Sequence, residues 1–555
     1  MDAFFRDEGS RVDHFDRLFI ATRVCSFYIR PYRNRSDMTL LNDDQVQRFI
    51  NSGFIEISLP ELDSVHSEVN SRLREVCAAE SQLGNNFLPR IPLLQQVLRN
   101  EKIHGALVSL LGSDYLIHPH RAIHRSTPLR EALDGFSLGS DRHLMGAGST
   151  ATSMWHQDAQ SPLARARHHV PKFLIGFYFP HEVTAEMGPT RFLRASHCDN
   201  GPDLSRSIYQ PEHVRAGTFF LAHFDIAHAG FPNVSNDDRF MLKFVFARTS
   251  QPTKPTWSSE RDYWSLPSED LVDAGLYEPA ASFIWNRMRG TANNEQGTES
   301  HKSRLSKSEI PRERRLRLIY GGVEGLSVQD CVAAFNSVQG EKKNERLHKN
   351  LRDSTRGHPV RWNERAVVME TAAYRLSFLG QESADTICSL IKSNDPWLQV
   401  NAAFAAGEIG VSDDEFASNL SDLLQSPYHQ VVRQAIDAIT FMKVHNHRRI
   451  LRHLKDLVLH KRPGWQTPLV KRGWSASDQI DMNVAMFLLA NCMQLEAQDL
   501  IDISSIMLQK SNDYSLLVIA EALVRSGDPI AQNHAIDYLK NRAWNTSLLG
   551  ADRAY

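Results

Sequence analysis

The chain has 555 residues, a formal net charge of −2 and 42% hydrophobic residues. This composition is typical of a soluble protein, and the length predicts about two to four domains. The near-neutral charge balance gives no global argument for binding to nucleic acid or to a membrane surface.

The six cysteines, at positions 25, 77, 198, 331, 388 and 492, are scattered and form no CxxC pair. Their spacing argues against a zinc ribbon or a disulfide framework and favours a reducing compartment. Residues 1–8 are too charged for a signal peptide, and no segment approaches the ~18 apolar residues of a membrane span. We therefore expect a cytoplasmic protein.

Residues 1–38 mix aromatic residues with many arginines, and we interpret them as an N-terminal extension without an assigned function. Residues 39–290 are interpreted as one domain. Its first part is predicted to contain, in order, a helix that begins near Asn42, a strand at 53–57, a helix at about 62–79 and an apolar helical segment at 92–111.

Strands dominate the rest of this domain. Runs rich in aromatic and β-branched residues predict strands at 115–125, 172–179, 190–193, 217–223 and 239–246. Residues 126–150, rich in Gly, Ser and charge, have the pattern of a long loop that could serve as a lid. We predict an α+β domain with a double-stranded β-helix core, a jelly roll of the cupin type, because its inner face can hold ligands from separate strands.

His156 and Asp158 stand two residues apart in the β-rich part. On a strand their side chains would share one face, because side chains alternate with a period of two. A third ligand from a distant strand would complete a 2-His-1-carboxylate triad, which holds Fe(II) and leaves coordination positions open. We predict that His228 is this third ligand. A HxD pair alone is weak evidence, since residues 223–225 form a second copy.

The order of these motifs resembles that of the phytanoyl-CoA dioxygenase family of Fe(II)/2-oxoglutarate oxygenases. Residues 187–197, Met-Gly-Pro-Thr-Arg-Phe-Leu-Arg-Ala-Ser-His, are similar to that family's Asn-Gly-Pro-x-x-x-x-Pro-Gly-Ser-His turn but depart from it at Met187, Arg194 and Ala195. In the family the second of two His residues five positions apart is the distal ligand, which implies His228 and leaves His223 as a supporting or core residue.

The resemblance also implies the co-substrates. Fe(II) would be the metal, 2-oxoglutarate and O2 the co-substrates, and ascorbate a stimulant. The family's 2-oxoglutarate-binding Arg lies eleven residues after the distal ligand, where this chain has Arg239. A guanidinium suits a carboxylate because it offers two parallel hydrogen bonds. Thr190 is a second candidate for binding the co-substrate. Asp158 favours hydroxylation over halogenation, because the related halogenases have a small residue there.

Several neighbouring residues are weaker candidates. Gln157 would face the opposite side of its strand and is interpreted as support for the ligands. Whether Thr190 and Arg191 point toward the pocket stays open. The sequence also offers Trp155, His120 and Arg121 as pocket residues. The basic loop with Arg165, Arg167, His168 and His169 is interpreted as solvated, with contact to an anionic substrate group as the alternative.

Residues 252–290 carry several Trp and Pro residues and are expected to wrap the barrel or close its mouth. Residues 291–362 are polar, with two basic clusters, and are interpreted as a linker. A charge run is usually a solvated face, so binding of nucleic acid or another anionic partner is the less favoured reading.

Residues 363–555 have the sequence pattern of an all-α domain. Leu379, Ile409 and Ile439 recur thirty residues apart in segments rich in Ala and aliphatic residues. A period of this length with paired helices indicates a solenoid. The segment resembles HEAT-type repeats in a short, PBS-lyase-like form. Two readings stay open, a surface for a protein partner and a packing domain for the first domain.

These observations predict an Fe(II)/2-oxoglutarate-dependent dioxygenase that hydroxylates an unactivated C–H bond, with release of succinate and CO2. The substrate would be a small molecule or a carrier-bound metabolite, and a carrier protein could bind through the HEAT-like domain. Neither a membrane nor nucleic acid is expected as a partner. The alternative is a HEAT-repeat adaptor whose oxygenase fold is mainly a binding module.

Overall fold

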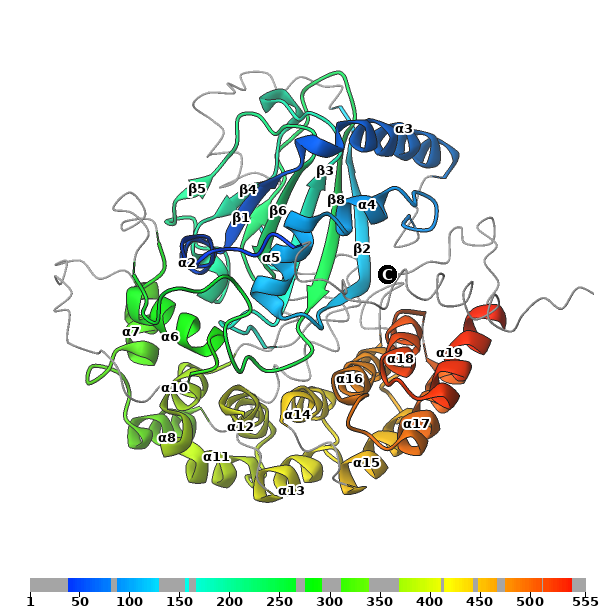
Figure 1. The fold of residues 1–555 in the computed structure, drawn as a ribbon. Coiled ribbons are helices and arrows are strands. Elements are labelled where there is room, and N and C mark those ends of the chain that lie inside the picture. The colour runs from blue at the N-terminus through cyan, green and yellow to red at the C-terminus, as the bar shows by residue number, and fades with distance from the viewer. Residues whose placement is uncertain are drawn as a thin grey trace, which may run out of the picture.

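The computed structural model describes residues 38–80, 87–128, 155–158, 166–265, 275–291, 311–338, 369–410, 414–442, 448–466, 475–511 and 513–541. The predicted N-terminal extension and the predicted lid lie outside these residues except at their edges. Figure 1 shows a β-rich part above an arc of helices.

The β-rich part contains two antiparallel sheets. Its strands are β1 (Phe54–Ser58), β2 (Leu116–Ser126), β3 (Phe173–Phe179), β4 (Arg191–Leu193), β5 (Ile208–Tyr209), β6 (Thr218–His223), β7 (His228–Ala229) and β8 (Arg239–Ala247). The larger sheet has the order β1-β6-β3-β8-β2, and the smaller sheet has the order β5-β4-β7. The strands predicted from the sequence are confirmed, with their ends shifted by about one residue.

The two sheets pack face to face through aromatic side chains. Phe192 of β4 stacks on Phe54 of β1 with ring centroids 4.8 Å apart, and Phe177 of β3 meets Phe192 at 5.3 Å. The strand register pairs Phe177 with both Phe220 and Lys243, so these three side chains share the inner face. The sheets confirm a β-rich core, while the double-stranded β-helix stays a prediction.

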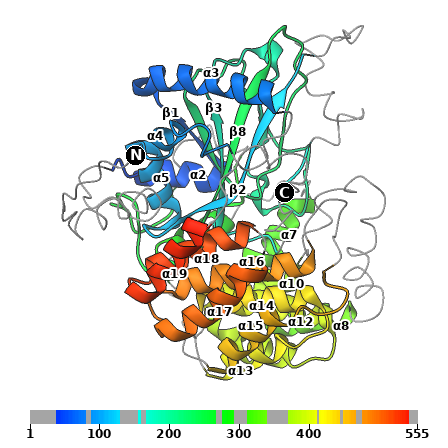
Figure 2. The ribbon, with the colours of Figure 1, turned by 90° about the vertical axis from the view of Figure 1, so that its right-hand side faces the viewer.

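The outer face of the larger sheet carries helices α3 (Asp63–Ala79), α4 (Leu94–Leu98) and α5 (Glu101–Leu111) (Figures 1 and 2). The hydroxyl of Tyr178 lies 2.7 Å from His66 Nδ1 of α3. A Cβ at Gly176 would come within 2.4 Å of the Phe219 ring, so only glycine lets the strands and this ring approach so closely.

Two further helices, α2 (Asp43–Ser52) and α6 (Glu278–Met288), lie at the edge of the β-rich part. The helix predicted to begin near Asn42 is confirmed, and the Asn42 side chain caps it by accepting a hydrogen bond of 2.9 Å from the Gln45 N–H. In α6, Trp285 is fully buried and its ring lies 5.0 Å from that of Trp257. The two tryptophans help to fix the segment after β8 onto the domain.

The C-terminal part is helical, as predicted. Its helices are α10 (Thr371–Leu379), α11 (Ala384–Ile391), α12 (Pro396–Ile409), α13 (Asp414–Leu423), α14 (His429–Phe441), α15 (Arg448–Leu459), α16 (Ala476–Asn491), α17 (Ala497–Lys510), α18 (Asp513–Arg525) and α19 (Pro529–Asn541). The even-numbered helices from α10 to α18 are successive neighbours and form the inner row, and α11 to α19 form the outer row (Figure 1). This two-layered arc is hereafter called the helical arc.

The predicted linker at 291–362 is wrong for two of its segments. Helices α7 (Pro311–Tyr320) and α8 (Val328–Ser337) form there and pack against α10. Buried Leu316, Ile319 and Phe335 recur at helical spacing in these segments. The arginines of α7 lower the mean hydropathy of this segment and hide its pattern, which explains why it was interpreted as part of a linker.

The loop that precedes β3, residues 167–172, joins the two parts of the molecule. His168 Nδ1 lies 2.9 Å from Glu408 Oε1 of α12, and its Nε2 lies 3.2 Å from Asp437 Oδ2 of α14. Lys172 Nζ lies 3.1 Å from the same Glu408 oxygen, and His169 stacks on Tyr374 of α10 with ring centroids 4.3 Å apart. The prediction that this basic loop is solvated is therefore wrong for its described residues, because the helical arc supplies acidic and aromatic partners.

At the other end of the arc, α18 lies beside β2 (Figure 2). The Arg525 guanidinium donates to the backbone carbonyls of Asp114 and Tyr115, and the Tyr514 ring lies 6.1 Å from that of His120. The arc thus contacts the β-rich part at two separate places.

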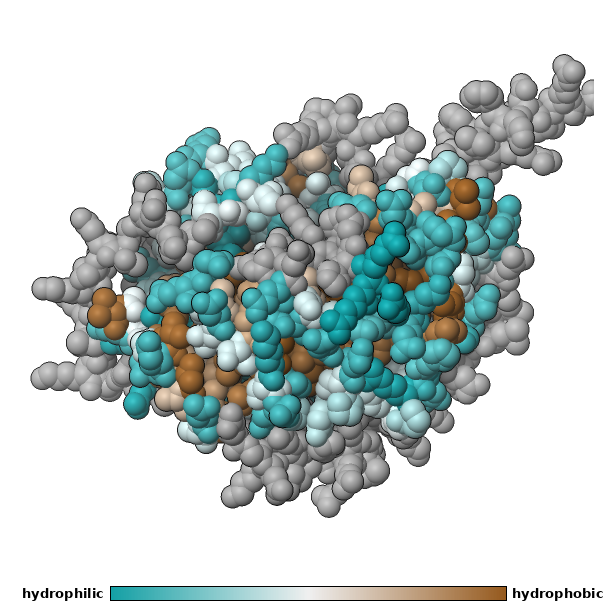
Figure 3. Space-filling view, turned by 90° about the horizontal axis from the view of Figure 1, so that it is seen from below, coloured by the Kyte–Doolittle hydropathy of each residue, from teal (hydrophilic) through white to brown (hydrophobic). Residues whose placement is uncertain are grey.

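The underside of the arc carries short hydrophobic stretches between hydrophilic ones (Figure 3). The large exposed hydrophobic residues of the described segments lie on separate elements, at Leu204, Tyr263, Val323, Met493 and Ile530. Single residues of this kind are ordinary on protein surfaces and do not mark an interface. None of the described helices is both long and apolar enough to cross a bilayer. The five cysteines of the described segments are free thiols, and Cys25 lies outside them.

Candidate metal centre

The three predicted ligands come together between the two sheets. Backbone hydrogen bonds of 3.0 and 3.1 Å join His156 to His228 of β7 in an isolated bridge. The Asp158 oxygens lie 3.7 Å from His156 Nε2 and 3.6 Å from His228 Nε2. One ligand atom from each of the three residues lies within 4.8 Å of the other two, and no second group of this kind occurs among the described residues.

The hydrogen bonding of His228 prepares this imidazole for a metal. His228 Nδ1 lies 3.0 Å from the carbonyl oxygen of Ile226, so it can donate a proton there and leave the lone pair of Nε2 toward Asp158. Burial lowers the pKa of His228 well below its ordinary value, and the neighbouring His156 adds to this shift. Neutral imidazole is the form that binds a metal ion.

Asp158 is a buried carboxylate that stays ionised. Burial alone would raise the pKa of Asp158, but the positive charge of Lys243 outweighs it and lowers the pKa far below its usual range. Lys243 Nζ forms an ion pair with Asp158 Oδ2. Two neutral imidazoles and one carboxylate fit the donor set of an Fe(II) triad, with other coordination positions left open.

Arg239 is a second buried cation on β8. The strand period places it on the same face of β8 as Lys243, four residues later. Among the described residues, its Nη1 donates to the carbonyl oxygens of Met187 and Phe231, at 3.3 and 3.4 Å, and its Nε finds no hydrogen-bond partner there. Burial lowers the pKa of Arg239 to about 10, so the guanidinium stays charged at neutral pH.

No carboxylate of the described residues forms an ion pair with Arg239, which is 6% exposed. Burial of an unpaired charge is unfavourable, so this guanidinium is suited to an anionic ligand. The predicted contact of Arg239 with the far carboxylate of 2-oxoglutarate stays a prediction.

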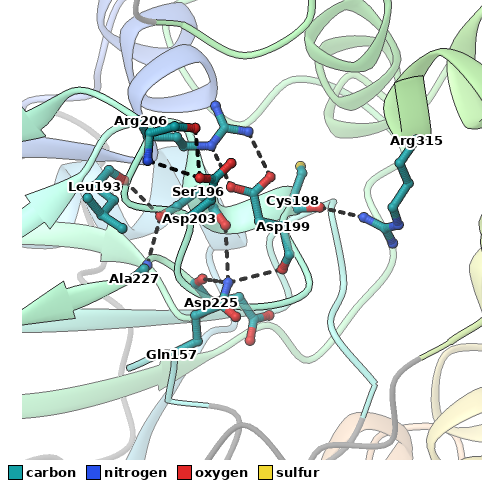
Figure 4. A network of polar contacts seen from close by, with 11 residues as sticks. Gln157, Leu193, Ser196, Cys198, Asp199, Asp203, Arg206, Asp225, Ala227 and Arg315 are labelled. Atoms are coloured by element: carbon teal, nitrogen blue, oxygen red, sulfur yellow. Dashed lines mark hydrogen bonds and ion pairs between the residues drawn. The ribbon is translucent and has the colours of Figure 1, made fainter. Parts of the chain in front are cut away.

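Gln157 supports the segment that carries two of the ligands (Figure 4). Its side-chain amide donates to the carbonyl oxygens of Ser196, Asp199 and Asp225 at 3.1, 3.1 and 2.8 Å. One fully buried side chain thus connects the His156–Asp158 segment to the turn before β5 and to the turn after β6. The prediction that Gln157 supports the ligands from the opposite side is confirmed.

The second HxD copy does not join the metal cluster. His223 is buried, its Nδ1 accepts a hydrogen bond of 3.1 Å from the Asp225 N–H, and its ring lies 5.0 Å from that of His197. It serves as a core residue, as the family resemblance implied. Burial raises the pKa of Asp225 to about 6, although the Arg167 charge opposes this shift.

The remaining candidates divide between the two faces of the sheets. Thr190 and Arg191 are both buried at the start of β4, and the Arg191 guanidinium lies 4.9 Å from the Trp155 ring. The contact of Thr190 with a co-substrate stays a prediction. Arg121 lies over the Phe87 ring at 5.9 Å on the outer face, so its prediction as a pocket residue is wrong. The register pairs Arg121 with Phe244, which lies on the face of β8 opposite Lys243.

The sequence analysis missed Lys243 and its place at the site. Its strand, Arg-Phe-Met-Leu-Lys-Phe-Val-Phe-Ala at 239–247, is apolar except for two cations four residues apart. Because four residues keep the parity of a strand, Arg239 and Lys243 had to share one face. That parity is the signal that could have found Lys243. Burial lowers the pKa of His120 to about 4, and the Lys243 charge adds to this shift.

Comparison with known proteins supports this reading of the site. Residues 142–241 match the family model described as phytanoyl-CoA dioxygenase (PhyH). The matched region contains the three ligands and Arg239. The match supports an iron- and 2-oxoglutarate-dependent oxygenase. No curated protein sequence matches the chain.

Solved structures with some similarity to this chain include three non-heme enzymes. The alpha-ketoglutarate-dependent carbocyclase SnoK from nogalamycin biosynthesis is 16% identical, with a TM-score of 0.29, and the alignment covers 38% of this chain and 87% of SnoK. HygX from Streptomyces hygroscopicus, with nickel and 2-oxoglutarate bound, is 12% identical, with a TM-score of 0.29 and coverage of 43% and 97%. The non-heme monooxygenase ThoJ in its nickel complex is 17% identical, with a TM-score of 0.26 and coverage of 42% and 94%.

Proposed function

We propose that the chain is an Fe(II)/2-oxoglutarate-dependent dioxygenase that hydroxylates an unactivated C–H bond of a small-molecule or carrier-bound metabolite. The observation that carries this proposal is the convergence of His156, Asp158 and His228 beside a buried guanidinium without a carboxylate partner among the described residues. The triad suits the metal, and Arg239 suits the co-substrate.

Each residue has a defined part in this proposal. His156, His228 and Asp158 hold the metal, and Arg239 binds the far carboxylate of 2-oxoglutarate and so orients its keto acid end toward the triad. With iron bound, the centre would couple conversion of 2-oxoglutarate and O2 into succinate and CO2 to oxidation of the substrate. The presence of the Asp158 carboxylate, instead of a small residue that would admit chloride, favours hydroxylation over halogenation.

For the rest of the chain we propose the domain organisation that the sequence favours. The double-stranded β-helix would occupy residues 39–290, and the helical arc at 363–555 would be a solenoid of HEAT-like repeats. The two-row stacking of its helices supports this class. Its role would be to recruit a carrier protein or to pack against the oxygenase domain in a cytoplasmic enzyme, without a membrane or nucleic acid as partner.

Succinate release tests the proposed function. Protein supplied with Fe(II), ascorbate and 2-oxoglutarate is expected to form succinate, and His228→Ala is expected to abolish this turnover because the metal loses one of three ligands. His213→Ala, which changes an exposed histidine of another ion pair, is the control. Equal succinate formation by the wild type and His228→Ala would contradict the assignment. A screen of metabolites for the mass shift of one added oxygen then identifies the substrate.

The alternative function, a binding module without turnover, has one observation in its favour. The Lys243 ammonium already forms an ion pair with a predicted metal ligand. If this ammonium stood in place of the metal, the fold would bind ligands without iron. The experiment at the end of the next subsection separates the two functions.

A further inference from the structure

Lys243 occupies a position that the packing of the sheet alone does not require. Its neighbours across the strands are Phe177 of β3 and Ala122 of β2, and its Nζ lies 5.8 Å from the centroid of the Phe177 ring. The side chain is 6% exposed. Replacement of a buried ion pair by apolar side chains is often neutral or stabilising, so retention of this charge in an aromatic core points to a role beyond packing.

The contact of Lys243 is specific to one oxygen of one ligand. Asp158 Oδ2 forms the ion pair with Lys243, while Asp158 Oδ1 faces His156 Nε2. Among the described residues, Asp158 is the carboxylate with which Lys243 forms an ion pair. An oxygen held by an ammonium is less able to give a second bond to a metal, so the pair favours coordination of the metal through a single oxygen.

The two cations on β8 also differ in the groups that they contact. Arg239 begins the strand and lies by the carbonyl oxygens of Met187 and Phe231, whereas Lys243 lies at the carboxylate ligand itself. With Fe(II), the triad alone has a net charge of +1, and Lys243 raises the local charge to about +2. Extra positive charge at the ligand end favours an anion that chelates the metal, independently of the anion's far end.

We propose that Lys243 is a positioning residue, which holds the second oxygen of Asp158 so that the metal is bound through one oxygen and the keto acid end of 2-oxoglutarate is favoured. This inference rests on the proposed function. Lys243 would thereby act at the chelating end of the co-substrate, while Arg239 acts at its far carboxylate.

Two 2-oxo acids separate these roles. Mn(II) is added to the protein, and binding of 2-oxoglutarate and of pyruvate is followed through displacement of Mn(II)-bound water, seen in proton relaxation. Pyruvate has the chelating end but no far carboxylate. A difference of about 1.4 kcal/mol in binding free energy corresponds to a tenfold change in affinity. We expect Lys243→Met and Lys243→Gln to weaken the binding of both acids by a similar factor of about tenfold, because each variant loses the attraction of one nearby positive charge. The affinity for Mn(II) should be unchanged or increased.

The matched variants make the result specific. Lys243→Arg keeps the charge and is expected to restore most of the affinity for both acids. Arg239→Met is expected to weaken the binding of 2-oxoglutarate but not the binding of pyruvate. Lys102→Met, at a partly exposed ion pair on α5, is the control for loss of a lysine and should bind as the wild type does.

Three outcomes would overturn the inference, each in a different way. In the first outcome, the wild type binds Mn(II) and 2-oxoglutarate, and Lys243→Met and Lys243→Gln bind both acids as the wild type does. This result would show that Lys243 does not have the proposed role, and it would leave the proposed function intact. A wild type that binds no Mn(II), beside a Lys243→Met variant that does, shows that the ammonium replaces the metal and supports the binding module. Absence of Mn(II) binding in both removes the proposed metal centre itself.

Discussion

The guanidinium of Arg239 shows how a single buried side chain can prepare a binding site for a ligand. Its charge is buried, and its recorded hydrogen bonds go to two backbone carbonyls at the long end of the normal range. A counter-ion would relieve this cost, and the far carboxylate of 2-oxoglutarate can supply it. The residue should therefore affect co-substrate binding more than folding or metal binding.

Arg239→Met tests this expectation in turnover. The concentration of 2-oxoglutarate needed for half-maximal succinate release is expected to rise by about tenfold or more, because a charge-assisted pair of hydrogen bonds is lost. Mn(II) affinity should not change. An unaltered requirement for 2-oxoglutarate would contradict the role assigned to Arg239, and Arg74→Met on α3 is a control for loss of an arginine outside the site.

Gln157 gives a second prediction at this scale. Its substitution by Leu would leave three buried carbonyl oxygens without this donor, so the free energy of unfolding should fall by about 2 kcal/mol or more. Metal affinity should fall as well, because the ligands on both sides of Gln157 lose their support. Denaturant unfolding and Mn(II) titration measure the two effects. Gln96→Leu, at an exposed position of α4, should show neither.

Much of the site could be predicted at the level of residues. The strand period placed His156 and Asp158 on one face, and the resemblance to a known turn distinguished His228 from His223. Lys243 was not predicted as a site residue because its partner, Asp158, lies 85 positions earlier in the sequence. No local sequence pattern links the two residues. Arg121 was misplaced because its face follows from its pairing with Phe244 of β8, which the sequence of β2 alone does not reveal.

At the scale of elements, α12 and α14 hold the 167–172 loop through a buried charge cluster. Glu408 contacts His168 and Lys172, its backbone carbonyl accepts a hydrogen bond from Arg287, and its side chain is 12% exposed. Asp437 of α14 contacts the second nitrogen of His168. The cluster is satisfied only when the helical arc and the β-rich part are docked.

Removal of the Glu408 charge should therefore destabilise the docked state. Glu408→Gln leaves Lys172 and a protonated His168 with less negative charge, and loss of one partner of a buried ion pair typically costs about 3–5 kcal/mol. The effect can be measured as a shift of the denaturant midpoint. Glu415→Gln, which makes the same change at the exposed pair with Lys392, should leave the midpoint nearly unchanged.

The same cluster predicts a pH dependence. Burial alone would lower the pKa of His168, but Glu408 and Asp437 outweigh it and raise the pKa, so this contribution is present below the ordinary value and is lost as the pH rises through the raised pKa. Burial alone would raise the pKa of Glu408, but Lys172 and His168 lower it, so its contribution is present above the ordinary value and is lost as the pH falls.

The docked state should thus be most stable between roughly pH 4.5 and 6.5 as far as these two groups decide. Unfolding measured across this range and up to pH 9 tests the prediction. Compared with the wild type, His168→Gln should show a weaker loss of stability on the alkaline side. An identical pH profile for the two proteins would exclude His168 as the group responsible.

The elements themselves were predicted unevenly. Long strands and the inner helices carry apolar residues in their own periods, and so they were visible in the sequence. Helix α7 was hidden by its arginines, and the two-residue strands β5 and β7 are too short for any periodicity. The burial of the 167–172 loop depends on partners from α10, α12 and α14, which no local pattern reveals.

At the scale of the whole molecule, one hydrophobic core runs through both parts. The buried apolar residues from Leu41 in the β-rich part to Ala535 in α19 form a single contiguous cluster. Domains joined by a small polar interface move and unfold separately, whereas a large apolar interface couples them. The two parts should therefore behave as one cooperative unit.

Differential scanning calorimetry tests this coupling. The wild type is expected to unfold in a single transition with equal calorimetric and van't Hoff enthalpies. Glu408→Gln combined with His169→Ala, which removes the stacking on Tyr374 as well, should separate this transition into two. Two transitions in the wild type would show that the parts are independent.

The burial of the 167–172 loop has a consequence for anyone who would divide this chain. His168 and Lys172 lie in the sequence of the oxygenase part, but their counter-ions, Glu408 and Asp437, belong to the helical arc. A truncated protein that ends before α10 would present to water a surface shaped for helices that are no longer there. Grafting this oxygenase onto another scaffold would accordingly require redesign of that surface, beginning with its two orphaned cations.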